Sequence, residues 1–428
     1  MSSRVYHDPL HGAIGLDRDD PAEALAMDLI ESAPFQRLRR IRQLGPAFLT
    51  FHGAESSRFT HSLGVLHLAR RALDGLEQRH PQLAEHRALL LAAALLHDIG
   101  HAPLSHSGEE MFGLHHETWS ARLIREHPQL HDRLEAHQNG LADAVADLLA
   151  RGRARCPAIK ALVSSQLDCD RLDYLMRDAY STGMSYGRID LERILAAFTL
   201  APDQSLAILP KGLMAVEHYL VVRNLMYRSV YNHRLNVVCN WLLSQVIRLA
   251  RRFGPTLIPA DAVMAAWLWD LDHLGIDNFL ANDDQRTGYH LMRWREEAPR
   301  PLAELCIRLL DRRLLKAIDV TALDNGQRLE LLATARRLSS AAGLDPDLHC
   351  GLQQRQSRGY HPYHGGLRLW DGVHLQALEQ HSPLVNSLSH NSTMAWLIHP
   401  GEVREELRRE RDLLAPPKLG PPAPQDVA

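Results

Sequence analysis

The chain has 428 residues, with 48 lysines and arginines against 51 aspartates and glutamates and a formal net charge of −3. This balance excludes a global basic field that would by itself indicate nucleic-acid binding. The five cysteines are scattered without a CxxC pair, which excludes a disulfide framework and a zinc knuckle. The longest apolar run, 88–96, is too short to cross a bilayer, and the N-terminus lacks a signal sequence. We therefore predict a soluble cytoplasmic protein without a membrane partner.

The N-terminal part predicts an arm followed by helices. Residues 4–16 carry Asp-Pro and His-Gly turn signals between short apolar pieces, which predicts a hairpin or an extended arm on the helical body. From residue 28 the pattern becomes helical, with Ser32 as a candidate N-cap and Pro34 in the first turn. Four arginines follow within 37–42. A basic helix face of this kind is usually only solvated, but it could also hold phosphate.

Two further helices carry candidate metal ligands. A Ser or Thr N-cap at residue 57 or 60 predicts a helix that begins near His61. An Ala/Leu-rich run at 89–96, of strong helix propensity, ends abruptly in His97 and Asp98. This pattern predicts ligand-type side chains at the mouth of a buried helix.

A later acidic segment predicts a third contributing helix. Asp170, Tyr174 and Asp178 fall at positions i, i+4 and i+8, so a helix places them on one polar stripe. The neighbouring Asp168 and Asp173 are interpreted as solvated charges or salt-bridge partners rather than as ligands.

The rest of the chain predicts a mainly α protein with a small α+β subdomain near its C-terminus. Further helices are predicted over 115–124, 128–151, 157–180, 212–253 and 258–340, with a short β excursion at 198–210. The composition changes at 345–400, where Gly, His and Pro clusters accompany β-like runs at 367–375 and 393–398. We expect an N-terminal arm and basic helix at 1–50, a helical catalytic core at 51–340, a small α+β C-terminal subdomain at 341–415 and a disordered proline-rich tail at 416–428.

The candidate ligands together predict a metal centre. His61, His97, Asp98 and Asp170 offer two imidazoles and two carboxylates, a donor set that suits Mn, Mg, Fe, Ni or Zn. A divalent ion of this kind polarises a phosphoryl group and lowers the pKa of its bound water. The sequence therefore indicates hydrolysis of a phosphate ester or anhydride.

Four ordered motifs resemble those of the HD superfamily phosphohydrolases. They are R-F-x-H-S-L-G-V at 58–65, H-D-I-G-H-x-P-x-S-H at 97–106, H-E at 116–117 and D-x-D-R-x-D-Y-x-x-R-D at 168–178. A lone HD is a weak signal, whereas four motifs in this order are a strong one. Within the superfamily, F-Q-R-L-R-x-I-x-Q-L-G at 35–45 makes the chain similar to the deoxynucleoside triphosphate triphosphohydrolases.

The resemblance implies an HD-domain helical core around the metal site. It also implies that the protein cleaves a dNTP to the deoxynucleoside and inorganic triphosphate by attack on the α-phosphorus. His61, His97, Asp98 and Asp170 match the metal ligands. His101, His116 and the nearby Glu109 match catalytic positions for water activation or leaving-group protonation.

The substrate contacts are likewise implied by the resemblance. The matching positions are Gln43 and Asp178 for the sugar 3′-hydroxyl, Leu44 and Tyr174 for the wall that excludes a 2′-hydroxyl, Arg58 and Arg171 for the triphosphate, His106 for the sugar and α-phosphate, and Arg223 and Tyr231 for the base and phosphate side. Arg171 stands where this family often has lysine. Family members are often assembled by nucleotide effectors, and Glu31 and Arg39 match effector positions approximately, with glutamate in place of aspartate at 31. We expect a homo-oligomer, a dimer or tetramer, with a nucleotide effector.

Two other functions stay open. A different HD-type phosphohydrolase, a nucleotidase or a phosphodiesterase, would release a product other than triphosphate. A nucleic-acid-binding scaffold would use the arginine-rich face at 37–42 and show steeply salt-dependent binding without turnover. The complete ligand set argues against the scaffold, because a scaffold needs neither four metal ligands nor the flanking histidines.

Overall fold

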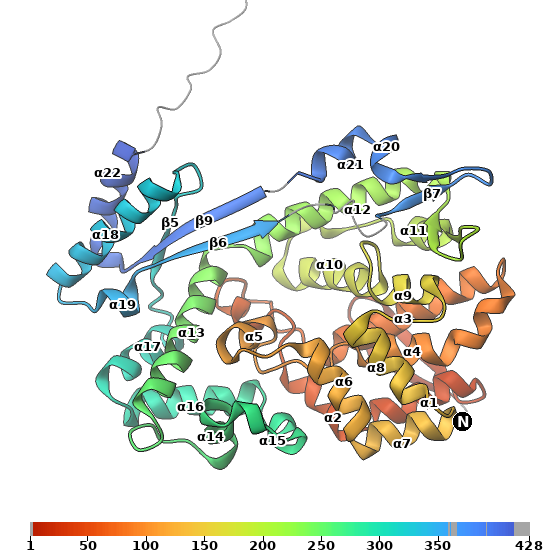
Figure 1. Ribbon diagram of the computed structural model, residues 1–428, viewed down its shortest axis with the longest axis horizontal. Helices are drawn as coiled ribbons and strands as arrows, with labels where there is room; N and C mark the ends of the chain where they lie inside the picture. Colours follow the sequence, from red (N-terminus) through yellow and green to blue (C-terminus); the bar gives the residue numbers. More distant parts are fainter. Residues whose placement is uncertain (1–2, 358–359, 361–365, 391, 415–428) are drawn as a thin grey trace, which may run out of the picture.

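The computed structural model of the protein describes residues 3–357, 360, 366–390 and 392–414. The described residues are mainly α-helical with a few short strands, which confirms the predicted fold class (Figure 1). The tail at 416–428, predicted to be disordered, lies outside the described residues. No helix in the described ranges combines the length and the hydropathy that a membrane crossing requires.

The predicted N-terminal arm is a hairpin followed by two capped helices. It consists of β1 (Ser3–Asp8), β2 (Gly12–Asp17), α1 (Pro21–Ile30) and α2 (Ala33–Arg37). β1 and β2 pair antiparallel, and the Asp8 carboxylate closes their turn by accepting hydrogen bonds from the backbone N–H groups of Leu10 and His11 at 2.9 Å each. The Ser32 side chain caps α2, with proline in the first turn, as predicted.

The catalytic half of the chain is a helical bundle. Its helices are α3 (Arg58–Glu77), α4 (Arg87–Leu96), α5 (His106–Phe112), α6 (His116–Glu126), α7 (Pro128–His137), α8 (Leu141–Arg151), α9 (Pro157–Val163), α10 (Cys169–Thr182) and α11 (Leu191–Ala197). α4 is apolar on nearly every side and packs against α1, α3 and α8. Because α4 is buried along its length, its last turn delivers His97 and Asp98 into the interior of the bundle.

The predicted helix over 212–253 is divided in the structure. The second half of the bundle contains α12 (Leu213–Met226), α13 (Arg234–Phe253), α14 (Ala262–Trp269), α15 (Ile276–Leu280), α16 (Asp284–Glu297) and α17 (Arg300–Leu310). A π-helical turn, Tyr227–Tyr231, separates α12 from α13. The turn is stabilised by the Asn236 side-chain amide, which donates a hydrogen bond to the Val230 carbonyl at 2.8 Å. Single π turns inside helices are typical of functional sites.

Two small sheets join segments that are distant in the sequence. The β excursion predicted at 198–210 is the hairpin of β3 (Phe198–Leu200) and β4 (Leu206–Ile208). β4 also pairs in parallel with β7 (Arg368–Trp370), which pairs with β8 (Leu375–Ala377), followed by α20 (Leu378–His381) and α21 (Pro383–Leu388). The second sheet has the order β5-β9-β6 and is antiparallel.

The second sheet and its helices lie at one end of the molecule and form a unit that packs on the helical bundle through β5 and β9 (Figure 1). Its elements are β5 (Lys316–Asp319), α18 (Asn325–Ala341), α19 (Pro346–His349), β6 (Gly351–Ser357), β9 (Ser392–His399) and α22 (Arg404–Leu414). A second hydrophobic cluster holds the unit together and includes Ile318, Leu331, Leu397 and Leu407. β5 and α18 therefore belong with the C-terminal elements, so the boundary predicted at 341 runs through this unit. β5 lies in a stretch for which only helix was predicted; its pairing with β9 is a long-range contact that a local pattern does not carry.

Gly100 lies where two chain segments approach closely. A Cβ atom at this position would lie 2.3 Å from the His116 carbonyl oxygen and 2.3 Å from the Ser120 backbone nitrogen. We predict that Gly100→Ala lowers the free energy of unfolding by about 1–3 kcal/mol, because backbone atoms must shift to relieve the overlap. Urea denaturation of the purified variants measures this change.

Gly75→Ala is the matched control for this prediction. Gly75 lies within α3, and a Cβ atom there would meet no atom within 4 Å. Its replacement should leave the stability unchanged or raise it by about 0.5–1 kcal/mol, since alanine is the better helix former. Equal stability of the two variants would contradict the close approach at Gly100.

Candidate metal and substrate site

The four predicted metal ligands come from three helices and lie together. His61 is in the first turns of α3, His97 and Asp98 follow α4, and Asp170 is in the first turn of α10. The His61 Nε2 atom is 3.1 Å from Asp170 Oδ1 and 3.2 Å from His97 Nε2. The Asp98 carboxylate completes the group, with Oδ1 at 3.3 Å from His97 Nε2 and Oδ2 at 3.5 Å from His61 Nε2. This group fits a divalent metal site by the chemistry of its donors.

Hydrogen bonds on the far side of each imidazole orient both histidines for metal binding. His97 Nδ1 lies 2.9 Å from the Ala94 carbonyl oxygen, which can only accept, so Nδ1 carries the proton and Nε2 keeps its lone pair. His61 Nδ1 lies 2.8 Å from Asp173 Oδ2, and this contact orients the ring so that Nε2 faces the other candidate ligands. Burial acts to lower the pKa of His61, but hydrogen bonds to Asp170 and Asp173 raise it to about 10. The site therefore attracts positive charge.

Asp173 is the salt-bridge partner that the sequence allowed, but it is buried beside the candidate ligand His61, which the sequence reasoning did not foresee. It was interpreted as a solvated charge or a salt-bridge partner; the structure buries its carboxylate fully and pairs it with Arg177, at 2.7 Å from Nε. Its Oδ1 also lies 2.6 Å from His11 Nε2, which belongs to the N-terminal hairpin. A Cβ atom at Gly64 would lie 1.9 Å from Asp173 Oδ1, so only glycine leaves room for this carboxylate. In the sequence, only the position of Asp173 in the motif at 168–178, directly before Tyr174, indicated that this residue belongs to the site region.

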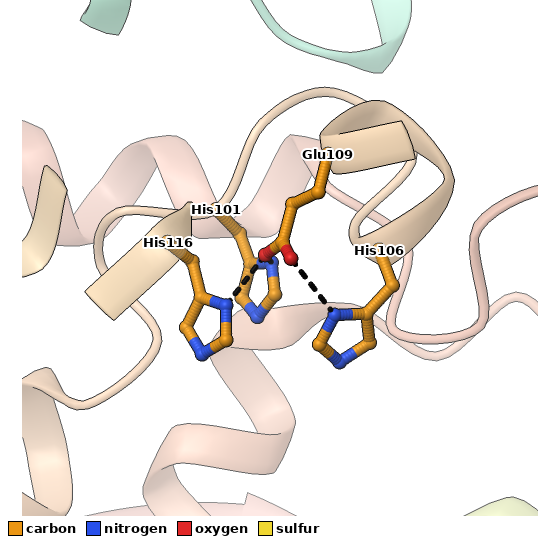
Figure 2. Close-up of side chains that lie close together, drawn as sticks. All are labelled: His101, His106, Glu109 and His116. Carbon is orange, nitrogen blue, oxygen red and sulfur yellow. Dashed lines mark hydrogen bonds and ion pairs between the residues drawn. The ribbon is translucent and has the colours of Figure 1, made fainter. Parts of the chain in front are cut away.

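The three predicted catalytic residues form a second cluster with His106 (Figure 2). Glu109 lies between the three histidines: its Oε1 is 2.5 Å from His116 Nδ1 and 3.4 Å from His101 Nδ1, and its Oε2 is 3.4 Å from His106 Nδ1. The His101 and His116 rings stack at a centroid distance of 4.1 Å. His101 Nε2 also lies 3.1 Å from Asp98 Oδ1, so this cluster adjoins the candidate metal site.

A histidine and the carboxylate of this cluster, His101 and Glu109, both have lowered pKa values. Burial lowers the pKa of His101 well below its usual range, and the nearby Arg58 cation lowers it further. Burial acts to raise the pKa of Glu109, but hydrogen bonds from His106 and His116 lower it below its usual range. A charged carboxylate that contacts several imidazoles stabilises a proton on any of their rings.

A cavity of about 380 Å³ connects the candidate ligands with most of the predicted substrate contacts. The predicted site residues that line it are Gln43, Leu44, Arg58, His97, Asp98, His106, His116, Asp170, Arg171, Tyr174, Asp178 and Tyr231. His61, His101 and Glu109 lie behind this wall. The cavity is also lined by Glu117, Ser164 and Tyr227, which were not among the predicted site residues. Tyr227 and Tyr231 reach it from the π-helical turn.

Asp178, which was predicted to contact the sugar 3′-hydroxyl, lines the cavity. Its Oδ2 accepts a hydrogen bond from the Tyr231 hydroxyl at 2.9 Å, and its Oδ1 is buried without a hydrogen-bond partner among the described residues. Burial raises the pKa of Asp178 to about 7. The Tyr174 ring lies nearly perpendicular to the Tyr231 ring, with centroids 5.8 Å apart. The free acceptor and the tyrosine wall fit a hydroxylated ring.

The predicted cationic contacts differ in their surroundings. Arg58 is buried and clamps Asp98, with 2.5 Å between Nη1 and Oδ2. Arg171 lines the cavity and pairs with Asp168, which caps α10 and is a buried salt-bridge partner. Arg223 lies outside the cavity wall, where Nη1 donates to the neutral Gln166 side chain at 2.9 Å and Nε has no partner within the described ranges.

The other predicted binding positions lie outside this cavity. Glu31 forms an ion pair with Arg4 of the hairpin, and Arg39 lies over the Phe59 ring at 3.6 Å, so their effector role stays a prediction. The arginines at 37–42 do not share one environment: Arg39 and Arg40 are exposed, and Arg40 and Arg42 pair with Asp283 and Glu55. Arg37, in contrast, is buried and donates to the Asn282 and His101 carbonyls. Arg37 therefore does not contribute to the basic face that a nucleic-acid scaffold would use.

Comparisons with known proteins identify the family of the chain. A family model described as HD domain matches residues 58–176, and one described as HD associated region matches residues 189–410. The uncharacterized protein YwfO of Bacillus subtilis (strain 168) is 33% identical over 396 residues, which cover 90% of this chain and 89% of the relative. A crystal structure of a phosphohydrolase from Bacteroides thetaiotaomicron VPI-5482 matches with a TM-score of 0.79 at 26% identity, over 93% of this chain and 99% of that one.

A more distant relative carries a named activity. The deoxynucleoside triphosphate triphosphohydrolase SAMHD1 homolog of Dictyostelium discoideum is 28% identical over 267 residues, which cover 59% of this chain and 50% of the relative. The chain thus spans about half the length of that relative. Together, the two family models, the near full-length relative and the matching fold decide the family. The chain belongs to the HD-domain family and is an HD-superfamily phosphohydrolase with an HD associated region.

Proposed function

We propose that this phosphohydrolase cleaves deoxynucleoside triphosphates to the deoxynucleoside and inorganic triphosphate. The observation that supports it is the single cavity in which the candidate metal ligands His97, Asp98 and Asp170 face the same space as Tyr174 and Asp178. A metal centre alone would serve any phosphate ester. The tyrosine wall and the free Asp178 acceptor are the features expected for a deoxyribose.

In the proposed mechanism the chain holds the substrate and moves its protons. A divalent ion held by His61, His97, Asp98 and Asp170, which we propose to be Mn²⁺ or Mg²⁺, supplies Lewis-acid polarisation of the α-phosphate and a water of lowered pKa when bound. Arg171 at the cavity wall attracts the triphosphate through its charge.

The histidine cluster behind the metal site provides the proton transfer. His116 and His106 reach the cavity, and Glu109 connects them at Nδ1, so a proton at one ring can be balanced by the carboxylate. His101, kept neutral by burial and by Arg58, supports the stack from behind.

Specificity for deoxyribose is proposed to come from shape and hydrogen bonding at the other end. Asp178 and Gln43 each keep a buried side-chain oxygen without a partner in the described part of the chain, and both line the cavity. Acceptors of this kind suit the 3′-hydroxyl, because an unsatisfied buried acceptor destabilises the complex until it is paired. Leu44 and Tyr174 supply the apolar wall that leaves no partner for a 2′-hydroxyl.

The experiment that tests the function is incubation of the purified protein with Mn²⁺ or Mg²⁺ and each dNTP and rNTP, singly and mixed, with products separated by ion-exchange chromatography. We expect deoxynucleoside and triphosphate from dNTPs but not from rNTPs, and loss of this activity in Asp98→Ala. Lys160→Ala, outside the catalytic cavity, is the control. Release of monophosphate or hydrolysis of phosphodiesters with intact dNTPs would instead assign a different phosphohydrolase.

The contact between Asp173 and His61 predicts that substitution of Asp173 weakens metal binding. Asp173→Asn removes the charge that holds the His61 Nδ1 proton, so we expect the dissociation constant for Mn²⁺ to rise by roughly tenfold to hundredfold. Isothermal titration with Mn²⁺ measures this directly and does not depend on turnover. His7→Ala, at an exposed position of the same hairpin, should bind Mn²⁺ as the wild type does. Unchanged affinity in Asp173→Asn would show that the carboxylate does not orient the ligand.

The raised pKa of Asp178 predicts that the stability of the protein depends on pH. Its folded-state pKa of about 7 lies above the ordinary value of 3.8, so the folded protein binds the proton more tightly than the unfolded chain. Stability therefore falls as the pH rises between these two values, by up to about 1.4 kcal/mol for each pH unit. Asp178→Asn carries no charge, so its thermal stability relative to wild type should be higher above pH 7 than at pH 4. A difference that does not vary with pH would contradict the raised pKa.

A further inference from the structure

A second cavity of about 130 Å³ adjoins the catalytic one. The two share Gln43, Leu44, His106 and Tyr231, and the second is completed by Gly45, Pro46, Ala47, Leu104, Ser105, Ser107, Asn236 and Asn240. By the same measure of volume one water requires about 10–15 Å³, so the second cavity has room for much more than a bound water.

The shared residues place the second cavity at the sugar end of the substrate. His97, Asp98, Asp170 and Arg171 line only the larger cavity, so the phosphates belong there. Leu44 and Tyr231 form the common wall between the two spaces. If the proposed function holds, the α-phosphate of the nucleotide lies at the metal site and its sugar lies against this wall. The second cavity is then the space beside the sugar that is available to the base.

Asn236 presents a fixed hydrogen-bond acceptor in the second cavity. Its Nδ2 donates to the Val230 carbonyl at 2.8 Å, and because that carbonyl can only accept, the orientation of the amide is determined. Asn236 is 7% exposed, and its Oδ1 is buried with no hydrogen-bond partner among the residues that the structure describes. Buried acceptors in folded proteins are normally paired, so this oxygen indicates a ligand that brings an N–H group.

A donor lies one helical turn away on the same face of α13. Asn240 Oδ1 accepts a hydrogen bond from the Ser107 hydroxyl at 2.7 Å, which leaves the N–H groups of the Asn240 amide as donors. Positions i and i+4 are neighbours on a helix surface. Asn236 and Asn240 therefore offer an acceptor beside a donor, the pattern that complements the amino group and the adjacent ring nitrogen of adenine or cytosine.

We propose that the second cavity receives the nucleobase and that Asn236 Oδ1 accepts a hydrogen bond from the exocyclic amino group of adenine or cytosine. Replacement of that amino group by an oxo group puts a second acceptor against Oδ1 and leaves both unpaired. The protein therefore prefers dATP over dITP and dCTP over dUTP. The members of each pair differ at this group and at the ring nitrogen beside it, which carries a proton in the oxo form and then faces the Asn240 donors instead of accepting from them. Loss of one such buried pairing corresponds to roughly a tenfold to hundredfold change in kcat/KM.

The test compares kcat/KM for the pairs dATP with dITP and dCTP with dUTP in the wild type and in three variants. Asn236→Leu removes the acceptor, and its amino-to-oxo ratios should approach one. Asn236→Asp loses the hydrogen bond to the Val230 carbonyl but keeps an acceptor oxygen at this position, so it should retain the preference even if both variants lose stability. Asn232→Leu is the matched control, since Asn232 is buried on the same segment but lines neither cavity.

Each outcome decides a different point. Equal kcat/KM for the amino and oxo members in the wild type, or a preference that survives in Asn236→Leu, overturns the base assignment while the triphosphohydrolase function stands. Failure of the wild type to release triphosphate from any dNTP overturns the proposed function and the base assignment with it. A preference lost in Asn236→Leu and kept in Asn232→Leu and Asn236→Asp supports Asn236 as the residue that selects the base.

Discussion

The buried carboxylate of Asp173 is the interaction on which the catalytic region depends. It contacts His11 of the N-terminal hairpin, His61 of α3 and Arg177 of its own helix, all within hydrogen-bond distance. A carboxylate without solvent is tolerated only where such partners fill its lone pairs. The hairpin, α3 and α10 must therefore be docked together before the candidate ligand His61 has the orientation seen in the structure. The arm at the N-terminus is in this sense a part of the site and not an appendage.

Two carboxylates of one helix show how position alone sets chemical behaviour. Asp170 lies against His61 and His97, and although burial acts to raise its pKa, these hydrogen bonds hold it below its usual range. Asp178, two turns later on α10, has one tyrosine hydroxyl as its hydrogen-bond partner, and burial raises its pKa to about 7. The same side chain is thus a charged ligand candidate at one end of the cavity and a titrating hydrogen-bond partner at the other.

Buried secondary structure and fixed side chains hold the candidate ligands His97 and Asp98 in place. α4 is buried along its length, so His97 and Asp98 are held by a helix that has little freedom to move. Arg58 fixes Asp98 from the other side and is itself fixed by Ser105, which accepts a hydrogen bond from its Nε at 2.9 Å. Ser105 adopts a φ of 58°, an unfavourable conformation for a residue with a side chain. Strained backbone of this kind persists where the surrounding contacts determine it, and it is concentrated at functional sites.

The sequence by itself determined the mainly α fold, the N-terminal hairpin, the Ser32 cap and the buried helix before His97, because each follows from local periodicity or turn chemistry. It also named the candidate ligands that the structure brings together. Only the tertiary structure decided the pairing of β4 with β7, the place of β5 beside β9, and the internal partners of Arg37, since these contacts join segments separated by more than fifty residues. The surroundings of Asp173 and Asn236 were also decided only by the tertiary structure. The groups that contact each buried side chain come from other segments of the chain, so no local sequence pattern predicts them.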